Sequence, residues 1–269
     1  MTQPQPDPST TRAIRLEVEA PGTPEELWET IASGPGITSW FVPATVTGGV
    51  GGTISLEFGP GMVETGPITV WEPPHRFVYS ENSGRNLAYE FVIEAQSGGA
   101  CIVRLINSGF GAGEAWDGEY ESMTGGWKLF LHMLVLGRTH FAGLPCASVI
   151  INSVSSQPAT EIWDTLTASL QLPPATVGEH IRAAGPDLPP LAGTVTRQTP
   201  GMLTILLDAP TSGVAFIVAE PWQDKTVAGI YLYLFGDDAA ATLARDEAGW
   251  RAWMERTLPS PAPAESPAS

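Results

Sequence analysis

Three acidic residues and one histidine are the side chains that could act in acid–base catalysis. Asp117, Glu119 and Glu121 alternate along one short segment, and His132 follows in an apolar stretch. A carboxylate and an imidazole that face one cavity can act as general acid and general base. However, the chain has 29 acidic residues, and close groups of acids are usually solvated. We therefore predict no catalytic residue, and an enzymatic activity is the less favoured alternative.

The thiols and imidazoles do not predict a metal site. Cys101 and Cys146 lie far apart and form no CxxC motif, and no histidine has another at a ligand spacing such as i, i+4. Because a structural metal needs three or four converging ligands, we predict no metal, no cofactor and two free thiols. The four histidines are His75, His132, His140 and His180.

The charge and hydropathy of the chain exclude several kinds of partner. Thirteen basic residues against 29 acidic ones give a formal net charge of -16, which repels phosphate backbones and anionic lipid surfaces. The sequence has no run of 18 apolar residues and no basic start followed by an apolar segment, as membrane spans and secretion signals require. We expect a cytoplasmic protein that binds neither nucleic acid nor membranes.

The length of the chain favours two domains. Its 269 residues, 43% of them hydrophobic, are enough for two domains of about 130 residues, each with its own core. Both ends differ from the rest, because residues 1–12 and 259–269 are rich in proline, serine and alanine and have little apolar surface to bury. We predict disordered tails there, a first domain at 13–143 and a second domain at 144–258.

The first domain should be an antiparallel sheet with helices at its beginning and end. Residues 14–20 alternate apolar and charged side chains, as a strand with one buried face does. Thr23 then caps a helix that starts with Pro24 and ends at Gly34. Five strand-like runs follow, and their connections are too short for crossover helices, which excludes a parallel sheet. These runs are residues 52–58, 63–71, 75–81, 86–95 and 100–107.

A long helix should close the first domain, from about Gly118 to Phe141. Its apolar side chains recur at helical spacing and form a stripe that must lie on the sheet. Gly125 and Gly126 fall within this helix, where each costs up to about 1 kcal/mol relative to alanine. We expect the close approach of a neighbouring element or a ligand to explain them. The stripe consists of Trp127, Phe130, Leu131, Leu134 and Val135.

The second half of the chain repeats this order. Ile-Trp-Asp-Thr-Leu at 162–166 matches Leu-Trp-Glu-Thr-Ile at 27–31, and a second Gly-Trp pair at 249–250 lies in another C-terminal helix. We also predict a short helix at 175–184. One domain plan therefore occurs twice, and the fold class is α+β: two tandem helix-grip domains, each a curved antiparallel sheet gripping a long C-terminal helix. The predicted strands of this half are 146–156, 192–198, 202–209, 213–222 and 226–236.

Several motifs of the first domain resemble, in order and spacing, the activator-of-heat-shock-protein-90-ATPase homology family of the START-like (SRPBCC) superfamily. They are "PGTPEELWETIASGPGITSWF", "GGTISLEF", "GPITVWEPPHRFVYSE", "INSGF" and "GGWKLFLHML". The resemblance covers about residues 12–142, and the second half resembles a diverged copy. The chain as a whole resembles a tandem bacterial member from an enediyne or polyketide antibiotic cluster.

The resemblance implies a binding protein. A long helix over a curled sheet can leave a cavity of about 300 to 1,000 Å³. We expect the first domain to bind a hydrophobic, aromatic or polycyclic small molecule there, in natural-product biosynthesis or self-resistance. Two alternatives stay open: a polyketide cyclase or aromatase-like enzyme, and a chaperone-interaction module. The eukaryotic relatives use an additional N-terminal domain on the chaperone, whereas only residues 1–12 precede the first domain here, so a chaperone partner is the less expected one.

The expected ligand-binding residues are inward-facing side chains of the strands and the long helix. Tyr89 and Phe91 are two residues apart and so share a strand face. A buried phenol such as Tyr89 needs a hydrogen-bonding partner, which a ligand can supply. We expect the glycine-rich segment 108–118 to form a flexible lid over the ligand, and any pocket of the second domain to be smaller or filled. The predicted set is Trp40, Phe58, Tyr89, Phe91, Trp116, Trp127, Phe130 and Leu131.

Overall fold

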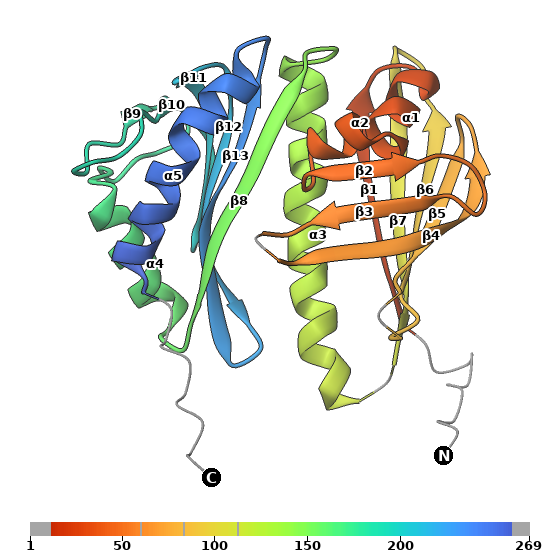
Figure 1. Ribbon diagram of the computed structural model, residues 1–269, viewed down its shortest axis with the longest axis horizontal. Coiled ribbons are helices and arrows are strands. Elements are labelled where there is room, and N and C mark those ends of the chain that lie inside the picture. Colours follow the sequence, from red (N-terminus) through yellow and green to blue (C-terminus); the bar gives the residue numbers. More distant parts are fainter. Residues whose placement is uncertain (1–11, 60, 83, 112, 260–269) are drawn as a thin grey trace. The chain divides into compact units, whose positions relative to one another are not determined.

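The computed structural model describes residues 12–59, 61–82, 84–111 and 113–259 (Figure 1). The predicted tails, residues 1–12 and 259–269, lie outside this part except for Arg12 and Pro259. The chain divides into two compact units. The first unit is Met1–Ile150 with Tyr233–Ala240, and the second is Ile151–Leu232 with Ala241–Ser269.

The first unit contains a seven-stranded antiparallel sheet with the strand order β1-β7-β6-β5-β4-β3-β2. The N-terminal strand pairs with the last one, and all other neighbours are consecutive in the chain. This topology confirms the predicted antiparallel meander and adds the short strand β2. The strands are β1 (Arg12–Pro21), β2 (Ala44–Thr47), β3 (Thr53–Glu57), β4 (Val63–Glu72), β5 (Arg76–Ser80), β6 (Ala88–Ala95) and β7 (Ala100–Phe110).

Two helices follow β1, α1 (Pro24–Ala32) and α2 (Gly34–Thr38). The predicted cap of α1 is present as a capping box. The Thr23 hydroxyl accepts a hydrogen bond from the amide of Glu26 at 3.3 Å, and the Glu26 carboxylate accepts one from the amide of Thr23 at 2.9 Å. This reciprocal pair satisfies two N–H groups that have no partner within the helix.

The long helix α3 (Glu114–His140) begins earlier than predicted and leaves no lid. Strand β7 continues to Phe110, because Ser108 and Phe110 still pair with β1. Gly109 lies within this strand and does not end it. Its φ is +102°, and a Cβ at this position would lie 2.3 Å from the carbonyl oxygen of Asn86, so a residue with a side chain would not fit here. The expected flexible lid at 108–118 is therefore wrong, since most of it is the end of β7 and the first turn of α3.

Gly125 and Gly126 of α3 have no protein neighbour that explains them. In the described part of the chain, nothing lies within 4 Å of a Cβ built on Gly125 or Gly126. The expected close approach of a neighbouring element is therefore wrong, whereas the approach of a ligand stays a prediction.

We expect Gly125→Ala and Gly126→Ala each to stabilise the first unit by up to about 1 kcal/mol, because alanine lowers the entropy cost of forming the helix without a clash. Thermal unfolding followed by circular dichroism would measure this. Gly66→Ala is the matched contrast, since its Cβ would lie 1.8 Å from the carbonyl oxygen of Ser80 and should destabilise. A loss of stability from either helix substitution would contradict the prediction.

A second sheet, with six strands in the order β8-β13-β12-β11-β10-β9, repeats the arrangement. Most of it belongs to the second unit, whereas the beginning of β8 and the end of β13 are counted with the first. Again the first strand pairs with the last, and a long helix, α5 (Ala239–Thr257), ends the described chain. The tandem α+β fold predicted from the repeat is confirmed. The other elements are β8 (Cys146–Ser155), α4 (Ala159–Ser169), β9 (His180–Arg182), β10 (Ala192–Thr199), β11 (Met202–Ala209), β12 (Gly213–Trp222) and β13 (Lys225–Phe235).

One element of the second unit differs from the prediction. The short helix expected at 175–184 is absent, and its place is taken by the strand β9, whose three residues pair with Ala192–Thr194. Gly178 has a φ of +92°, a conformation that ends a helix. Among the described residues, no helix is both long and apolar enough to cross a membrane.

Candidate functional site

Seven aromatic side chains of the first unit gather around α3 in one aromatic cluster. Phe41 lies at its centre, with ring centroids 4.9 Å from Trp127 and 4.6 Å from Phe130. Trp127 also faces Tyr89 and Phe91, at 5.7 and 6.2 Å. The structure thus brings together six of the eight predicted ligand-binding residues. The aromatic cluster consists of Trp40, Phe41, Phe58, Tyr89, Phe91, Trp127 and Phe130.

Most of the aromatic cluster is closely packed. Trp40 and Trp127 are 1% and 4% exposed, whereas Phe58 and Phe130 are half-buried and mark its edge. Leu131, one turn after Trp127, is buried as well. Trp116 packs instead on Phe110, with ring centroids 6.1 Å apart.

A polar group that the sequence reading missed lies beside Tyr89. Glu81 follows β5 and is only 5% exposed at its side chain. Its carboxylate accepts a hydrogen bond from the Tyr89 hydroxyl and two-point contacts from the guanidinium of Arg85, at 3.1 to 3.2 Å. Arg85 also forms an ion pair with Glu119 of α3. We call Glu81, Arg85, Tyr89 and Glu119 the Glu81 network. Together they join the β5–β6 turn to α3.

Burial keeps the phenols near this network protonated. It raises the pKa of Tyr79 well above its usual value, and the carboxylates of Glu64 and Glu81 add to the effect. Burial likewise raises the pKa of Tyr89, with further contributions from Tyr79 and from its hydrogen bond to Glu81. Tyr89 is therefore a hydrogen-bond donor to Glu81 over the whole physiological pH range.

We expect Glu64→Gln to raise the free energy of unfolding at pH 7 and to leave it unchanged near pH 4. Partial burial raises the pKa of Glu64, the Glu81 carboxylate raises it further, and Arg85 opposes both. The folded state therefore keeps this proton to a higher pH than the unfolded chain, so stability is lost as pH rises through the raised pKa. Because Glu64 is still largely exposed, the gain should stay below about 1 kcal/mol.

Urea unfolding at the two pH values would check this prediction. Glu57→Gln is the matched control, since Glu57 is an exposed glutamate of the adjoining strand β3. An equal gain from both substitutions, or a gain already present near pH 4, would show that Glu64 has no specific effect.

Asn107 is the second polar residue that the sequence reading missed. It is fully buried on β7, at 0% exposure. Its side-chain oxygen accepts a hydrogen bond from the indole N–H of Trp127 at 3.2 Å, and its amide nitrogen donates one to the carbonyl of Ala88 at 3.2 Å. Both Asn107 and Glu81 continue an inward alternation, after Leu105 and Tyr79 respectively, and this period of two was the signal that could have found them.

Two of the three acids considered for catalysis form ion pairs. Asp117 contacts Arg12 at 2.7 Å, and Glu119 contacts Arg85. Glu121 is exposed and His132 is half-buried. Within the described ranges, no three histidine, cysteine or acidic side chains are grouped so that they could hold a metal ion.

Comparison with known families matches residues 21–136 to the model described as "Activator of Hsp90 ATPase homolog 1-like protein". This part of the chain is therefore similar to the family. The match begins at the end of β1 and extends into α3, so it includes every residue of the aromatic cluster and of the Glu81 network. A search of the curated proteins finds no match.

Several solved structures are similar to part or most of this chain. The Aha1 dimer from Colwellia psychrerythraea is 19% identical, with a TM-score of 0.43, over 49% of this chain and 99% of that one. The di-domain ARO/CYC BexL from the BE-7585A biosynthetic pathway is 11% identical, with a TM-score of 0.46, over 93% and 99%. DynU16, a putative protein in the dynemicin biosynthetic locus, is 15% identical, with a TM-score of 0.42, over 90% and 95%.

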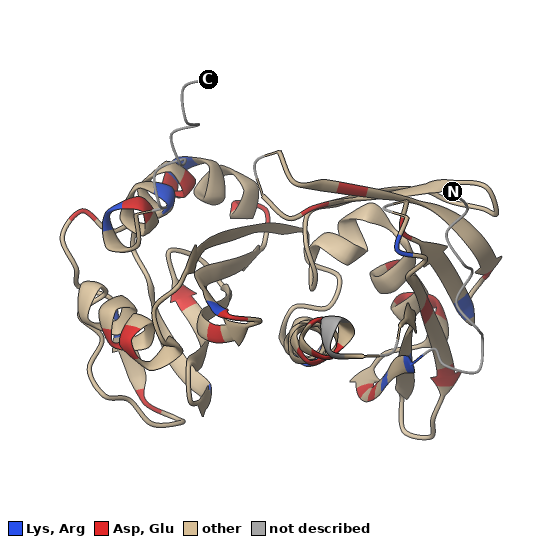
Figure 2. Cartoon of the chain, turned by 90° about the horizontal axis from the view of Figure 1, so that it is seen from below, with Lys and Arg blue, Asp and Glu red and all other residues tan. Residues whose placement is uncertain are grey.

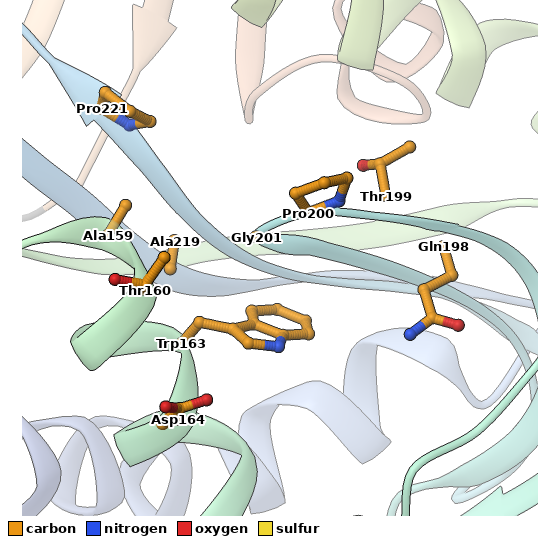
Figure 3. A pocket seen from close by; sticks show the side chains of 10 residues that line it. All are labelled: Ala159, Thr160, Trp163, Asp164, Gln198, Thr199, Pro200, Gly201, Ala219 and Pro221. Atoms are coloured by element: carbon orange, nitrogen blue, oxygen red, sulfur yellow. The ribbon is translucent and has the colours of Figure 1, made fainter.

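A surface hollow of about 700 Å³ lies in the second unit, outside the family match, beside α4 (Figure 3). A smaller one, of about 480 Å³, lies on the first unit and is lined by residues of β1 and β7, including Arg15 and Arg104. No residue of α3 or α5 lines either hollow, so the expectation that a pocket of the second domain is smaller or filled stays a prediction. We call the larger one the α4 hollow; it is lined by Ala159, Thr160, Trp163, Asp164, Gln198, Thr199, Pro200, Gly201, Ala219 and Pro221.

Proposed function

We propose that the first unit binds a hydrophobic, aromatic or polycyclic small molecule between α3 and its sheet, without turnover, in natural-product biosynthesis or self-resistance. The observation that carries this proposal is the edge of the aromatic cluster. Phe58 and Phe130 are half-buried and both contact Phe41, at 5.6 and 4.6 Å. A flat ligand can enter there by rotating these two rings, while the deeper rings stay packed.

The energetics of such a site require a polar anchor. Burying about 300 Å² of apolar ligand surface contributes on the order of 7 kcal/mol, against an association cost of at least about 4 kcal/mol. The surplus alone gives only weak binding, so a ligand hydroxyl or carbonyl that hydrogen-bonds to the Glu81 network would strengthen it. Tyr89 belongs to both groups and thus links the apolar and the polar part of the proposed site.

The test is a titration with 2-naphthol, a neutral bicyclic aromatic probe, followed by tryptophan fluorescence. We expect saturable quenching and, in Phe130→Ala, an affinity lower by about 1 to 3 kcal/mol, since an aromatic contact at the entrance is lost. Trp222→Ala serves as control, because this exposed side chain belongs to the second unit. Unchanged affinity in a folded Phe130→Ala variant would refute the proposal.

The hydrogen bond between Tyr89 and Glu81 favours a second candidate, a cyclase or aromatase-like enzyme. A phenol and a carboxylate in contact can pass a proton to and from an enol. Tyr89→Phe would then abolish turnover of a polyketide-like substrate while 2-naphthol still binds. The chaperone-interaction alternative predicts a changed ATPase rate of Hsp90 when the protein is added, and no effect of 2-naphthol on it.

A further inference from the structure

The α4 hollow combines an aromatic wall with a single charge. Trp163 is half-buried and extends from α4 into the hollow, between Pro200 and Pro221 on one side and Asp164 on the other (Figure 3). Two threonines and Gln198 add hydrogen-bonding groups. A volume of about 700 Å³ is within the range of small-molecule sites.

Asp164 gives the α4 hollow a negative charge without a counterion. Of the ten residues that line the hollow, Asp164 is the one with an ionisable side chain. In the part of the chain that the structure describes, no salt bridge joins Asp164 to a basic residue. Arg197 precedes Gln198 in the chain and interacts with Glu220, because it lowers the pKa of Glu220 that burial raises.

We propose that the α4 hollow binds a small organic cation, a protonated amine that carries an aromatic or aliphatic ring. The ring of the ligand and the CH₂ group next to its nitrogen pack on the indole of Trp163. The ammonium group donates a hydrogen bond to the carboxylate of Asp164. An indole face attracts cations through its quadrupole, and a carboxylate adds a charge-assisted hydrogen bond. The net charge of -16 raises the local concentration of cationic ligands.

Benzylammonium and benzyl alcohol are matched probes, because they differ in the charged group and share the ring. The readout is the indole ¹H–¹⁵N signal of Trp163, identified by its loss in Trp163→Phe. We expect benzylammonium to shift this signal saturably, with an affinity about fivefold to tenfold higher than that of benzyl alcohol. Asp164→Asn should remove most of this difference by lowering the affinity for benzylammonium, while the attraction of the Trp163 indole for the charge remains. It should leave the affinity for benzyl alcohol unaffected.

Glu161→Gln is the control, since Glu161 is an exposed carboxylate of the same helix that does not line the α4 hollow. It should leave both affinities unchanged. Equal binding of the two probes, no effect of Asp164→Asn, or the same loss in Glu161→Gln would each overturn the proposal, as would a Trp163 signal that does not saturate. These results are independent of 2-naphthol binding in the first unit.

Discussion

Trp127→Ala should lower the free energy of unfolding of the first unit by about 3 to 5 kcal/mol, the range found for truncating a buried tryptophan. The side chain is 4% exposed. Its ring packs on Phe41 and Tyr89, at 4.9 and 5.7 Å, and its N–H is bound to Asn107. The substitution therefore removes ring contacts from several sides and leaves a buried amide oxygen without its donor.

Urea unfolding monitored by circular dichroism would measure this loss. Trp222→Ala is the control for truncating a tryptophan as such, because Trp222 is 36% exposed and should cost less than about 1 kcal/mol. A similarly small loss for Trp127→Ala would mean that the space beneath α3 is open rather than packed. This result therefore also decides how much of the aromatic cluster is available to a ligand.

The sheet of the first unit could be predicted because its strands have one inward face. Leu87, Tyr89, Phe91 and Ile93 share a face by their spacing of two, and the structure buries all four. In the second unit, apolar runs were the signal, since strands such as β12 are buried on both faces. The capping box at Thr23 was equally readable, because all its partners are within three residues. Local periodicity and local hydrogen bonds are the features that a sequence displays directly.

The missed features depend on tertiary contacts and on turns that periodicity does not display. Segment 108–118 was interpreted as a lid because of its glycines, but the pairing of β7 with β1 keeps Gly109 in a strand. Asn107 finds its indole partner 20 residues away, and Glu81 meets Arg85 and Tyr89 only once the β5–β6 turn has formed. Neither the charge of Glu81 nor the amide of Asn107 predicts burial, because such groups are buried only when tertiary partners satisfy them.

The same limit applies to the α4 hollow. The match between residues 162–166 and 27–31 predicted a similar helix with a tryptophan in each domain. In the first unit Trp28 is 7% exposed and packs on Trp71, with ring centroids 4.9 Å apart. In the second unit Trp163 lines a surface hollow instead. The helix pattern could not distinguish these two outcomes, since the ring that covers Trp28 comes from a strand far along the chain.

Asn107→Asp should make the stability of the first unit strongly dependent on pH. A neutral aspartic acid can replace both hydrogen bonds of Asn107, with its hydroxyl donating to the Ala88 carbonyl and its carbonyl accepting from the Trp127 indole. An ionised aspartate cannot donate a hydrogen bond to the Ala88 carbonyl, and its charge would be fully buried. Burial therefore raises the pKa of the new carboxyl in the folded state above about 3.9, its usual value.

The direction of the effect follows from proton binding. Above about pH 4 the unfolded chain has released this proton and the folded state still holds it, so stability falls by about 1.4 kcal/mol for each pH unit. At pH 7 the free energy of unfolding of the variant should be about 4 kcal/mol lower than that of the unsubstituted protein. At pH 5.5 this difference should be about 2 kcal/mol. Urea unfolding between pH 5.5 and 7.5 would measure this slope. Asn82 is exposed in the same unit, so the stability of Asn82→Asp should not show this dependence on pH. A flat profile for Asn107→Asp would mean that water reaches position 107, and the space between α3 and the sheet would then be a solvated cavity rather than a packed core.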